Sequence, residues 1–484
     1  MAKAVMRVLT SDEEEFIHRR TLQVLEEIGV LVRSDSVLSA LEDAGASVDE
    51  RSHVAKMPEE MVKGALRSAP TSFRLCARRR DNDIDLPASR GPHLTTDGLT
   101  LYVHDDDTGE NRNATKEDFA NFARLADALE PVDFFWPIVT ISDVPSGSHN
   151  LHELWTALKN CGMHVQGDCT SAGDAKKMIE LGAIIAEGRE ELRNRPLFSC
   201  ATNPISPLSF DKGAVEAQAE FAKAGIPVLC HSMSIAGMSS PVTLAGTIVN
   251  INAENLASIV ISQSACTGAP HIYGSCSAPA DMRSGTVDFY APEAMLISVA
   301  AGQMARRYGR PCMVASWGMG GKGAGNRLSH SQAFAYASNA FAGSDLISGI
   351  GGLDHAKGCS LAQMVLDSAE WIDFEPFLKD FAIDSSAVAL DAMREVGPGN
   401  SFLSHLHTVK NFRTELGIRE DRSLLLRSLG SDLRWKEARA AARALVKDHH
   451  VDSLDSKCIM EGDRILKEHD RALLRKTGIA TVSL

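Results

Sequence analysis

Short apolar runs recur along the middle of the chain, and this repeat constrains the fold more than any other feature of the sequence. Most of the runs are separated by roughly 30 to 45 residues with helical patterning, which predicts parallel strands joined by crossover helices. The runs are apolar on both faces and end in small or polar residues, so we predict an α/β fold, a closed (β/α)8 TIM barrel. The seven runs lie at 134–141, 164–167, 197–201, 228–231, 271–275, 313–317 and 346–349.

An open, doubly wound sheet is the competing fold, but no Gly-x-Gly-x-x-Gly motif follows the first run. The barrel needs an eighth strand, from either the β-rich segment at 73–103 or the region after Trp371. We therefore divide the chain into three parts. Residues 1–131 form an N-terminal extension of helices and a β-hairpin, 132–380 the barrel core, and 381–484 C-terminal helices that wrap the barrel and contribute to an oligomer contact.

Composition and charge exclude several classes of protein. A net charge of −13 with dispersed basic residues argues against a nucleic-acid partner. The ten cysteines form no Cys-x-x-Cys pair, which favours reduced, buried thiols over disulfides or a zinc knuckle. No signal peptide or membrane-spanning segment is recognisable, so we expect a cytoplasmic protein that does not enter a membrane.

If the barrel is correct, the functional residues lie at the C-terminal ends of its strands. The strand ends supply aromatic, amide, carboxylate and imidazole groups, but no lysine and no recognisable Ser-His-Asp arrangement. We expect His355 to line the site and Asp354 to support it. The strand-end residues are Trp136, Gln166, Asp168, Asn203, His231, Ser232, Ser275, Trp317, Asp354 and His355.

Two other motifs suggest chemistry less strongly. The Gly-rich segment 318–325 departs from a phosphate-binding loop, because Gly323 occupies the Ser/Thr position. A flexible loop that lets a bulky partner approach is the better interpretation. His405 and His407 are spaced as a metal pair could be, but structural or substrate-contacting roles, shared with nearby Phe402, are favoured over metal ligation.

Several motifs taken together resemble the trimethylamine methyltransferase family, and the resemblance runs nearly from end to end. The motifs are DDDTGE at 105–110, SPVTLAG at 240–246, NAE at 252–254, DMRSG at 281–285, GLD at 352–354 and EVGPGN at 395–400, followed by Phe402-Leu403 and His405-Leu406-His407-Thr408. The resemblance implies a TIM barrel and methyl transfer to a cognate corrinoid protein, with no tightly bound cofactor and no metal in this chain.

One departure from the family pattern narrows the substrate. Trimethylamine enzymes of this family carry pyrrolysine after the sixth strand, whereas the matching segment here, 326–333, has an ordinary residue, Leu328, at that place. The chain therefore resembles the pyrrolysine-free branch, whose members demethylate quaternary amines such as glycine betaine, proline betaine or carnitine. A quaternary ammonium leaves as a neutral amine without protonation, so it needs no activating electrophile.

Such a site must hold a cation and orient one methyl group outward. Trp136, Trp317 and Tyr273 are candidates for cation–π contact, worth ~0.5–2 kcal/mol each, although core packing is the alternative for each ring. A betaine carboxylate needs hydrogen-bond donors in the site. Glu254, by contrast, is either a carboxylate of the site or a buried group on a helix face. The full candidate set for substrate binding is His355, Trp136, Trp317, Arg283, Arg327, His231, Asn203, Gln166, Glu254, Phe402, His405 and His407.

Three rival functions remain at this stage. A zinc-dependent or other corrinoid methyltransferase acting on a different donor would need clustered Cys or His ligands. A barrel lyase or aldolase without corrinoid would need a Schiff-base lysine at a strand end. A non-catalytic amine-binding protein is disfavoured by the absence of an export signal.

Overall fold

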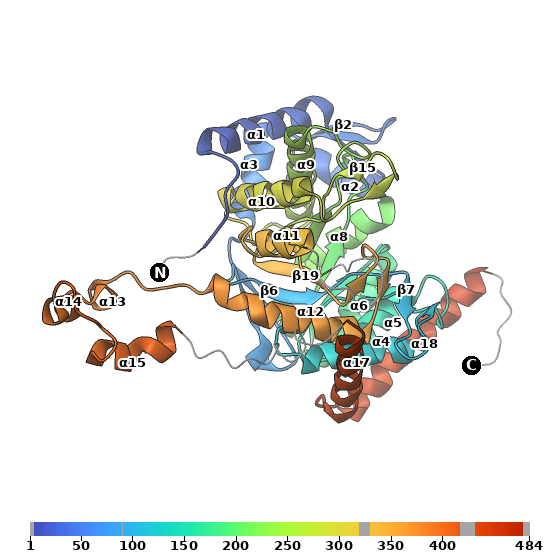
Figure 1. Ribbon diagram of the computed structural model, residues 1–484. Helices are drawn as coiled ribbons and strands as arrows, with labels where there is room; N and C mark the ends of the chain where they lie inside the picture. Colours follow the sequence, from blue (N-terminus) through green and yellow to red (C-terminus); the bar gives the residue numbers. More distant parts are fainter. Residues whose placement is uncertain (1–3, 90, 319–329, 417–430, 478–484) are drawn as a thin grey trace.

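The computed structural model of the protein describes residues 4–89, 91–318, 330–416 and 431–477, and a closed parallel barrel lies at its centre (Figure 1). The barrel sheet has the order β17-β14-β13-β11-β10-β9-β6-β19-β18, and its neighbouring strands pair in parallel. The two ends of this order, β17 (Cys312–Met313) and β18 (Ala315–Ser316), are halves of one strand interrupted at Val314. The sheet therefore closes on itself as eight strands, which confirms the predicted barrel.

The other barrel strands are short and mostly buried. The strands β10, β11, β14 and β19 are buried at every residue, because the interior covers one face and helices cover the other. Their bounds are β6 (His93–Thr96), β9 (Val132–Phe135), β10 (His164–Asp168), β11 (Phe198–Thr202), β13 (Val228–Ser232), β14 (His271–Ser275) and β19 (Leu346–Ile350).

A helix follows each barrel strand and returns the chain to the start of the next. Several of these helices begin at a side-chain cap, such as the capping box of Thr115 and Asp118 at the start of α4. The eight helices are α4 (Lys116–Ala128), α5 (His149–Asn160), α6 (Ala172–Ile185), α8 (Lys212–Ala224), α9 (Leu244–Ala265), α10 (Pro292–Arg307), α11 (His330–Ala340) and α12 (Leu361–Phe374).

The eighth strand comes from the β-rich segment that precedes the repeat. The strand β6 lies between β9 and β19, so the barrel begins before residue 132. Earlier in the same segment, β4 (Phe73–Leu75) and β5 (Ile84–Leu86) form an antiparallel hairpin. Its apolar residues pack against interior side chains of the barrel such as Phe134 and Leu229.

The N-terminal segment packs around α9, the longest barrel helix. Helices α1 (Ser11–Gln23), α2 (Asp35–Asp43) and α3 (Glu59–Ser68) contact α9. Thr10 and Glu13 form the capping box at the start of α1. By length and composition alone α9 could span a membrane, but 78% of its most apolar window is buried inside the fold. It is therefore packed as a core helix.

A small mixed sheet completes this N-terminal cover. It has the order β12-β1-β3-β2, so the segment before the barrel pairs with a short strand inserted after β11. Its strands are β1 (Val30–Val32), β2 (Ser47–Asp49), β3 (Val54–Lys56) and β12 (Ser209–Phe210).

The C-terminal helices fall into two groups. Helix α17 (Ser431–Asp448) packs on α12, and α18 (Ser456–Thr477) packs on α5 and α6. Between α12 and α17 the chain forms an arm, residues 379–416, that stands away from the barrel (Figure 1). The arm carries α13 (Ser385–Val388), α14 (Leu390–Val396) and α15 (Leu406–Glu415), and none of the residues in these three helices is buried.

Candidate active site

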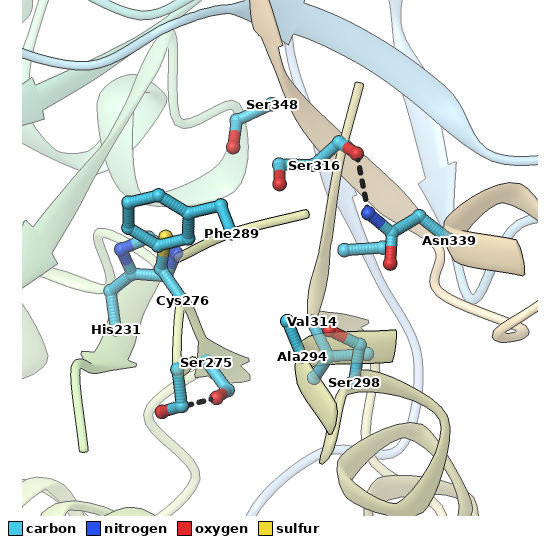
Figure 2. A pocket seen from close by; sticks show the side chains of 12 residues that line it. His231, Ser275, Cys276, Phe289, Ala294, Ser298, Val314, Ser316, Asn339 and Ser348 are labelled. Carbon is cyan, nitrogen blue, oxygen red and sulfur yellow. Dashed lines mark hydrogen bonds between the residues drawn. The ribbon is translucent and has the colours of Figure 1, made fainter. Parts of the chain in front are cut away.

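A cavity opens at the C-terminal ends of β13, β14, β18 and β19, where a barrel enzyme carries its chemistry. The space open to the centre of a water molecule is about 10 Å³, so the cavity is narrow. Figure 2 shows His231, Phe289 and Cys276 on one side and Ser316, Asn339 and Ser348 on the other. The lining residues are His231, Ser275, Cys276, Ser277, Phe289, Ala294, Ser298, Val314, Ala315, Ser316, Asn339 and Ser348. None of them is a lysine or an arginine.

Trp136 stands directly after β9 and is held rigidly beside this cavity. Its indole Nε1 donates a 2.6 Å hydrogen bond to the Oδ2 of Asp168, and its ring lies edge-on to His231 with centroids 5.3 Å apart. Gly98 packs against the indole, and a Cβ at that position would come within 2.9 Å of Trp136 Cε2. The indole therefore supports one wall of the site, as part of the packing around His231.

His231 is the predicted site residue that lines the cavity itself. It lies on β13, and the alternation of the strand turns Leu229 and His231 toward the barrel axis. Burial lowers the pKa of His231 to about 4. The imidazole is thus neutral near pH 7, so it can exchange hydrogen bonds without repelling a cationic ligand.

Two buried carboxyl groups lie at strand ends near the cavity. Burial raises the pKa of both Asp97, which follows β6, and Asp168, which ends β10, to about 7. Asp168 accepts the indole hydrogen bond described above, whereas Oδ2 of Asp97 has no partner among the described residues. Asp97 is absent from the sequence-based candidates.

Glu254 lies on α9, is fully buried, and is held by hydrogen bonds from its surroundings. Its Oε2 accepts from Ser206 Oγ at 2.9 Å and Ser232 Oγ at 2.5 Å, and its Oε1 accepts from the Leu208 amide at 2.9 Å and Asn250 Nδ2 at 3.0 Å. Burial raises its pKa, although these donors act in the opposite direction. Glu254 fastens the loops after β11 and β13 to α9, so its lone pairs are already in use.

Two of the proposed aromatic contacts face away from the cavity. Trp317 is buried against Tyr336 and Trp371 between the barrel and its outer helices, and its Nε1 donates to the Asp367 carbonyl at 3.2 Å. Tyr273 is buried with its hydroxyl donating to Asn252 Oδ1 at 3.2 Å. Both rings are packing residues, the alternative that the sequence had left open.

The remaining barrel candidates differ in how far they are exposed to solvent. Gln166 is buried inside the barrel, and its Oε1 has no partner among the described atoms. Asn203, just after β11, is exposed, as is Arg283 on the turn between β15 (Ala280–Asp281) and β16 (Thr286–Val287). Arg327 lies outside the described residues.

His355 occupies a turn with unusual backbone geometry at the mouth. Asp354, His355 and Ala356 have φ values of 52°, 59° and 62°, so three consecutive non-glycine residues are left-handed. The His355 ring lies 5.6 Å from that of Tyr290, the neighbour in sequence of cavity-lining Phe289, and its buried Nδ1 has no partner among the described residues. His355 is therefore placed for an external acceptor or donor.

Phe402, His405 and His407 lie on the arm, away from the cavity. His405 caps α15, because its Nδ1 accepts from the His407 amide at 3.1 Å, and its Nε2 lies 3.0 Å from Glu395 Oε2. The structure thus gives the His-x-His motif a local capping role and does not bring it to the barrel mouth. In the described part of the chain, no three His, Cys, Asp or Glu side chains are grouped as metal ligands.

A closed parallel barrel with a polar cavity at the C-terminal strand ends defines the class of (β/α)8-barrel enzymes. The family comparison makes the assignment specific: the sequence model of the trimethylamine methyltransferase (MTTB) family matches residues 2–416. The chain belongs to this family, and it is a methyltransferase.

Curated relatives agree with that assignment, and a solved structure shares the fold. The chain is 34% identical to trimethylamine methyltransferase MttB of Desulfitobacterium hafniense, covering 84% of this chain and 82% of the relative. It is 30% identical to the glycine betaine methyltransferase of another strain of that species, covering 84% and 85%. The monomethylamine methyltransferase MtmB of Methanosarcina barkeri shares the fold, with a TM-score of 0.50, 13% identity, and coverage of 91% and 93%.

Proposed function

We propose that this enzyme takes a methyl group from a small quaternary amine, glycine betaine or a close relative, and gives it to a corrinoid protein. The observation that carries the proposal is the absence of any cationic side chain among the described residues that line the cavity, beside a neutral imidazole and two buried carboxyl groups. Such surroundings favour a ligand that brings its own positive charge. The ordinary residue Leu328 at the position of pyrrolysine supports the same substrate class.

The chemistry asks little of the protein beyond binding and orientation. In the transfer, the C–N bond breaks with its electron pair moving to nitrogen, so the amine leaves neutral and no proton has to be supplied. The neutral His231 and the rigid Trp136 shape the cavity, and burial of the site excludes water from the reacting methyl group.

The mouth of the barrel fits a protein partner. Exposed apolar side chains gather on the loops after β11, β13 and β14, an arrangement typical of docking surfaces. A Cβ at Gly237 would lie 3.4 Å from Met282 Sδ and 3.5 Å from Val242 Cγ2, so these two loops meet. When bound, the partner's corrinoid would supply Co(I) as the nucleophile. The exposed residues are Ile205, Met233, Met238, Val242 and Met282.

A betaine also carries a carboxylate, and the mouth offers donors for it. His355 has a buried nitrogen without a partner among the described residues, and Arg283 and Asn203 are exposed on the loops after β14 and β11. We propose that His355 binds the carboxylate directly and that Arg283 attracts it. The enzyme is further proposed to act in the cytoplasm and as a homo-oligomer, with the arm at 379–416 in the subunit contact, because its exposed apolar residues lack cover within one chain.

The decisive experiment mixes the purified enzyme with reduced corrinoid and a panel of glycine betaine, proline betaine, carnitine, choline and trimethylamine. Methylated corrinoid is followed by its absorbance. We expect glycine betaine or a close relative to react and trimethylamine to remain inert. Turnover of trimethylamine alone would reverse the substrate assignment, and inertness toward every quaternary amine would refute the proposal.

A further inference from the structure

Asp97 carries a buried carboxyl group that the fold places at the C-terminal end of β6. Its amide donates to the Ile350 carbonyl at 3.0 Å, which fixes the backbone between β6 and β19. Leu94 packs outward with the helices, so the alternation of the strand turns Thr95 and Asp97 toward the barrel axis. The residue is 3% exposed.

Asp97 lies close to the cavity. Burial raises the pKa of Cys276, the negative charge of Asp97 adds to that effect, and Cys276 lines the cavity. Asp97 is also followed directly by Gly98, which packs against Trp136, the ring in contact with His231. The carboxyl group thus belongs to the same layer of the barrel as the cavity wall.

One oxygen of this carboxyl group is not used by the described protein. Oδ1 accepts a 2.9 Å hydrogen bond from the Gly98 amide, whereas Oδ2 is buried without a partner among the described residues. A buried carboxylate is costly unless a charge or a hydrogen-bond donor compensates it. This oxygen has no described partner, and no described lysine or arginine lines the neighbouring cavity, so a cationic ligand that reached Oδ2 would supply the missing charge.

We propose that the Asp97 carboxylate is the counter-charge that binds the quaternary nitrogen of the substrate. This inference rests on the proposed function and assigns the residue that selects the cation. A quaternary ammonium has no N–H to donate, so it interacts with its surroundings mainly through charge and its methyl groups. A carboxylate oxygen with no other partner attracts such a ligand through its charge. An acceptor that already receives hydrogen bonds from the protein has less capacity left for it.

The role predicts a particular kinetic pattern. The positive charge on nitrogen decreases as the C–N bond breaks, so Asp97 stabilises the bound substrate more than the transition state. Interactions that favour the ground state lower KM without raising kcat. Substitution of Asp97 is therefore expected to raise KM and to leave kcat unchanged or higher, whereas a purely structural residue would affect both.

The test compares two ligands that differ only in charge at the central atom: glycine betaine and tert-butylacetate, in which a quaternary carbon replaces nitrogen. Binding is measured by calorimetry without corrinoid, for wild type and for Asp97→Asn. Asp97→Asn removes the electrostatic attraction between the carboxylate and the ammonium group in a partly buried site. We expect this loss to weaken glycine betaine binding by about tenfold or more. Affinity for tert-butylacetate should stay within about twofold, since it offers no charge to the carboxylate.

Asp168→Asn is the matched control, because Asp168 is similarly buried and has a similarly raised pKa but accepts the Trp136 indole hydrogen bond. It should change the affinity for both ligands alike. Equal losses for both ligands in Asp97→Asn, or no loss for glycine betaine, would overturn the proposal, provided that circular dichroism shows a folded variant. If wild type binds no quaternary amine, the proposed function itself fails.

Discussion

Two buried carboxyl groups on opposite sides of the barrel mouth differ in how the protein uses them. Glu254, on the side of β11 and β13, accepts hydrogen bonds from three serine hydroxyls, an amide side chain and a backbone amide. Asp97, on the side of β6 and β19, accepts one, from its neighbour Gly98. Both are nearly inaccessible to solvent, and burial raises the pKa of both.

The difference shows that burial and a raised pKa do not by themselves identify a functional acid. A carboxylate whose lone pairs are all used by the protein holds the fold together, whereas one with an unused oxygen has capacity left for a ligand. The comparison assigns a structural role to Glu254 and a ligand-binding role to Asp97. Each assignment can be tested separately.

The largest effect is expected from Glu254→Ala. The substitution leaves several buried donors without an acceptor and releases two loops from α9, so we expect a loss of about 3–5 kcal/mol of stability. Thermal and denaturant unfolding measure it. Glu254→Gln, which keeps an acceptor and the shape, should lose less. A Glu254→Ala protein that unfolds like wild type would show that the hydrogen bonds to this carboxylate contribute little.

A smaller effect should follow from Asp168→Ala, which leaves the indole N–H of Trp136 buried without its acceptor. The expected cost is about 1–3 kcal/mol of stability, measured by the same unfolding experiments. Asp97→Asn is the informative counterpart, because removing a buried, incompletely compensated charge should leave stability unchanged or increased at pH 8. Strong destabilisation by Asp97→Asn would contradict the division between structural and ligand-binding carboxyl groups.

Binding of a quaternary ammonium should depend on pH through Asp97. Because burial raises its pKa to about 7, the carboxyl group takes up a proton and loses its charge as pH falls, so affinity for glycine betaine should drop by roughly tenfold from pH 8 to pH 6. Cys276, just after β14, and Cys359, on β21 (Gly358–Cys359), stay neutral because burial raises their thiol pKa values, and burial also raises the pKa of Asp367 on α12.

The pH experiment needs two variants, because Asp168 has a pKa similar to that of Asp97 and titrates in the same range. Affinity measured by calorimetry should become independent of pH in Asp97→Asn and remain dependent on pH in Asp168→Asn. The reverse result would transfer the role to Asp168.

The smallest effect concerns His355, at the other end of the ligand. If its unpaired Nδ1 binds the carboxylate of a betaine, His355→Ala should weaken glycine betaine binding by about three- to tenfold, the equivalent of one hydrogen bond. Tetramethylammonium, which has no carboxylate, should bind to this variant as it does to wild type. Equal losses for both ligands would mean that the left-handed turn shapes the cavity and does not contact the carboxylate.

The barrel could be predicted from the sequence because parallel strands covered on both faces are continuous apolar runs. The missing strand, His93–Thr96, is short and contains two threonines, so it did not stand out as a run. Asp97 was missed for the same reason, since candidates were collected only at the ends of recognised strands. A search for any polar residue after a short strand within the β-rich segment would have found it.

The site was harder to predict than the fold, because side-chain direction at a strand end depends on register. Trp317 follows a strand whose two halves pair with different neighbours, and its ring points to the outer helices. The prediction for Phe402, His405 and His407 rests on the motif alone, and the motif does not indicate that this segment leaves the barrel. His231 ends the run at 228–231 and Trp136 lies within the run at 134–141, so both positions stand out in the sequence.

The packing of α9 has a consequence for how the chain is made. On the ribosome, the N-terminal segment that covers this helix is synthesised before the helix itself. The apolar helix α9, long enough to span a bilayer, can therefore pack on N-terminal helices that are already synthesised as it emerges. Chaperones or the membrane-insertion machinery then have less opportunity to bind it. A circular permutation that moves residues 1–70 to the end of the chain would have α9 synthesised before the segment that covers it, while the contacts in the folded protein stay the same.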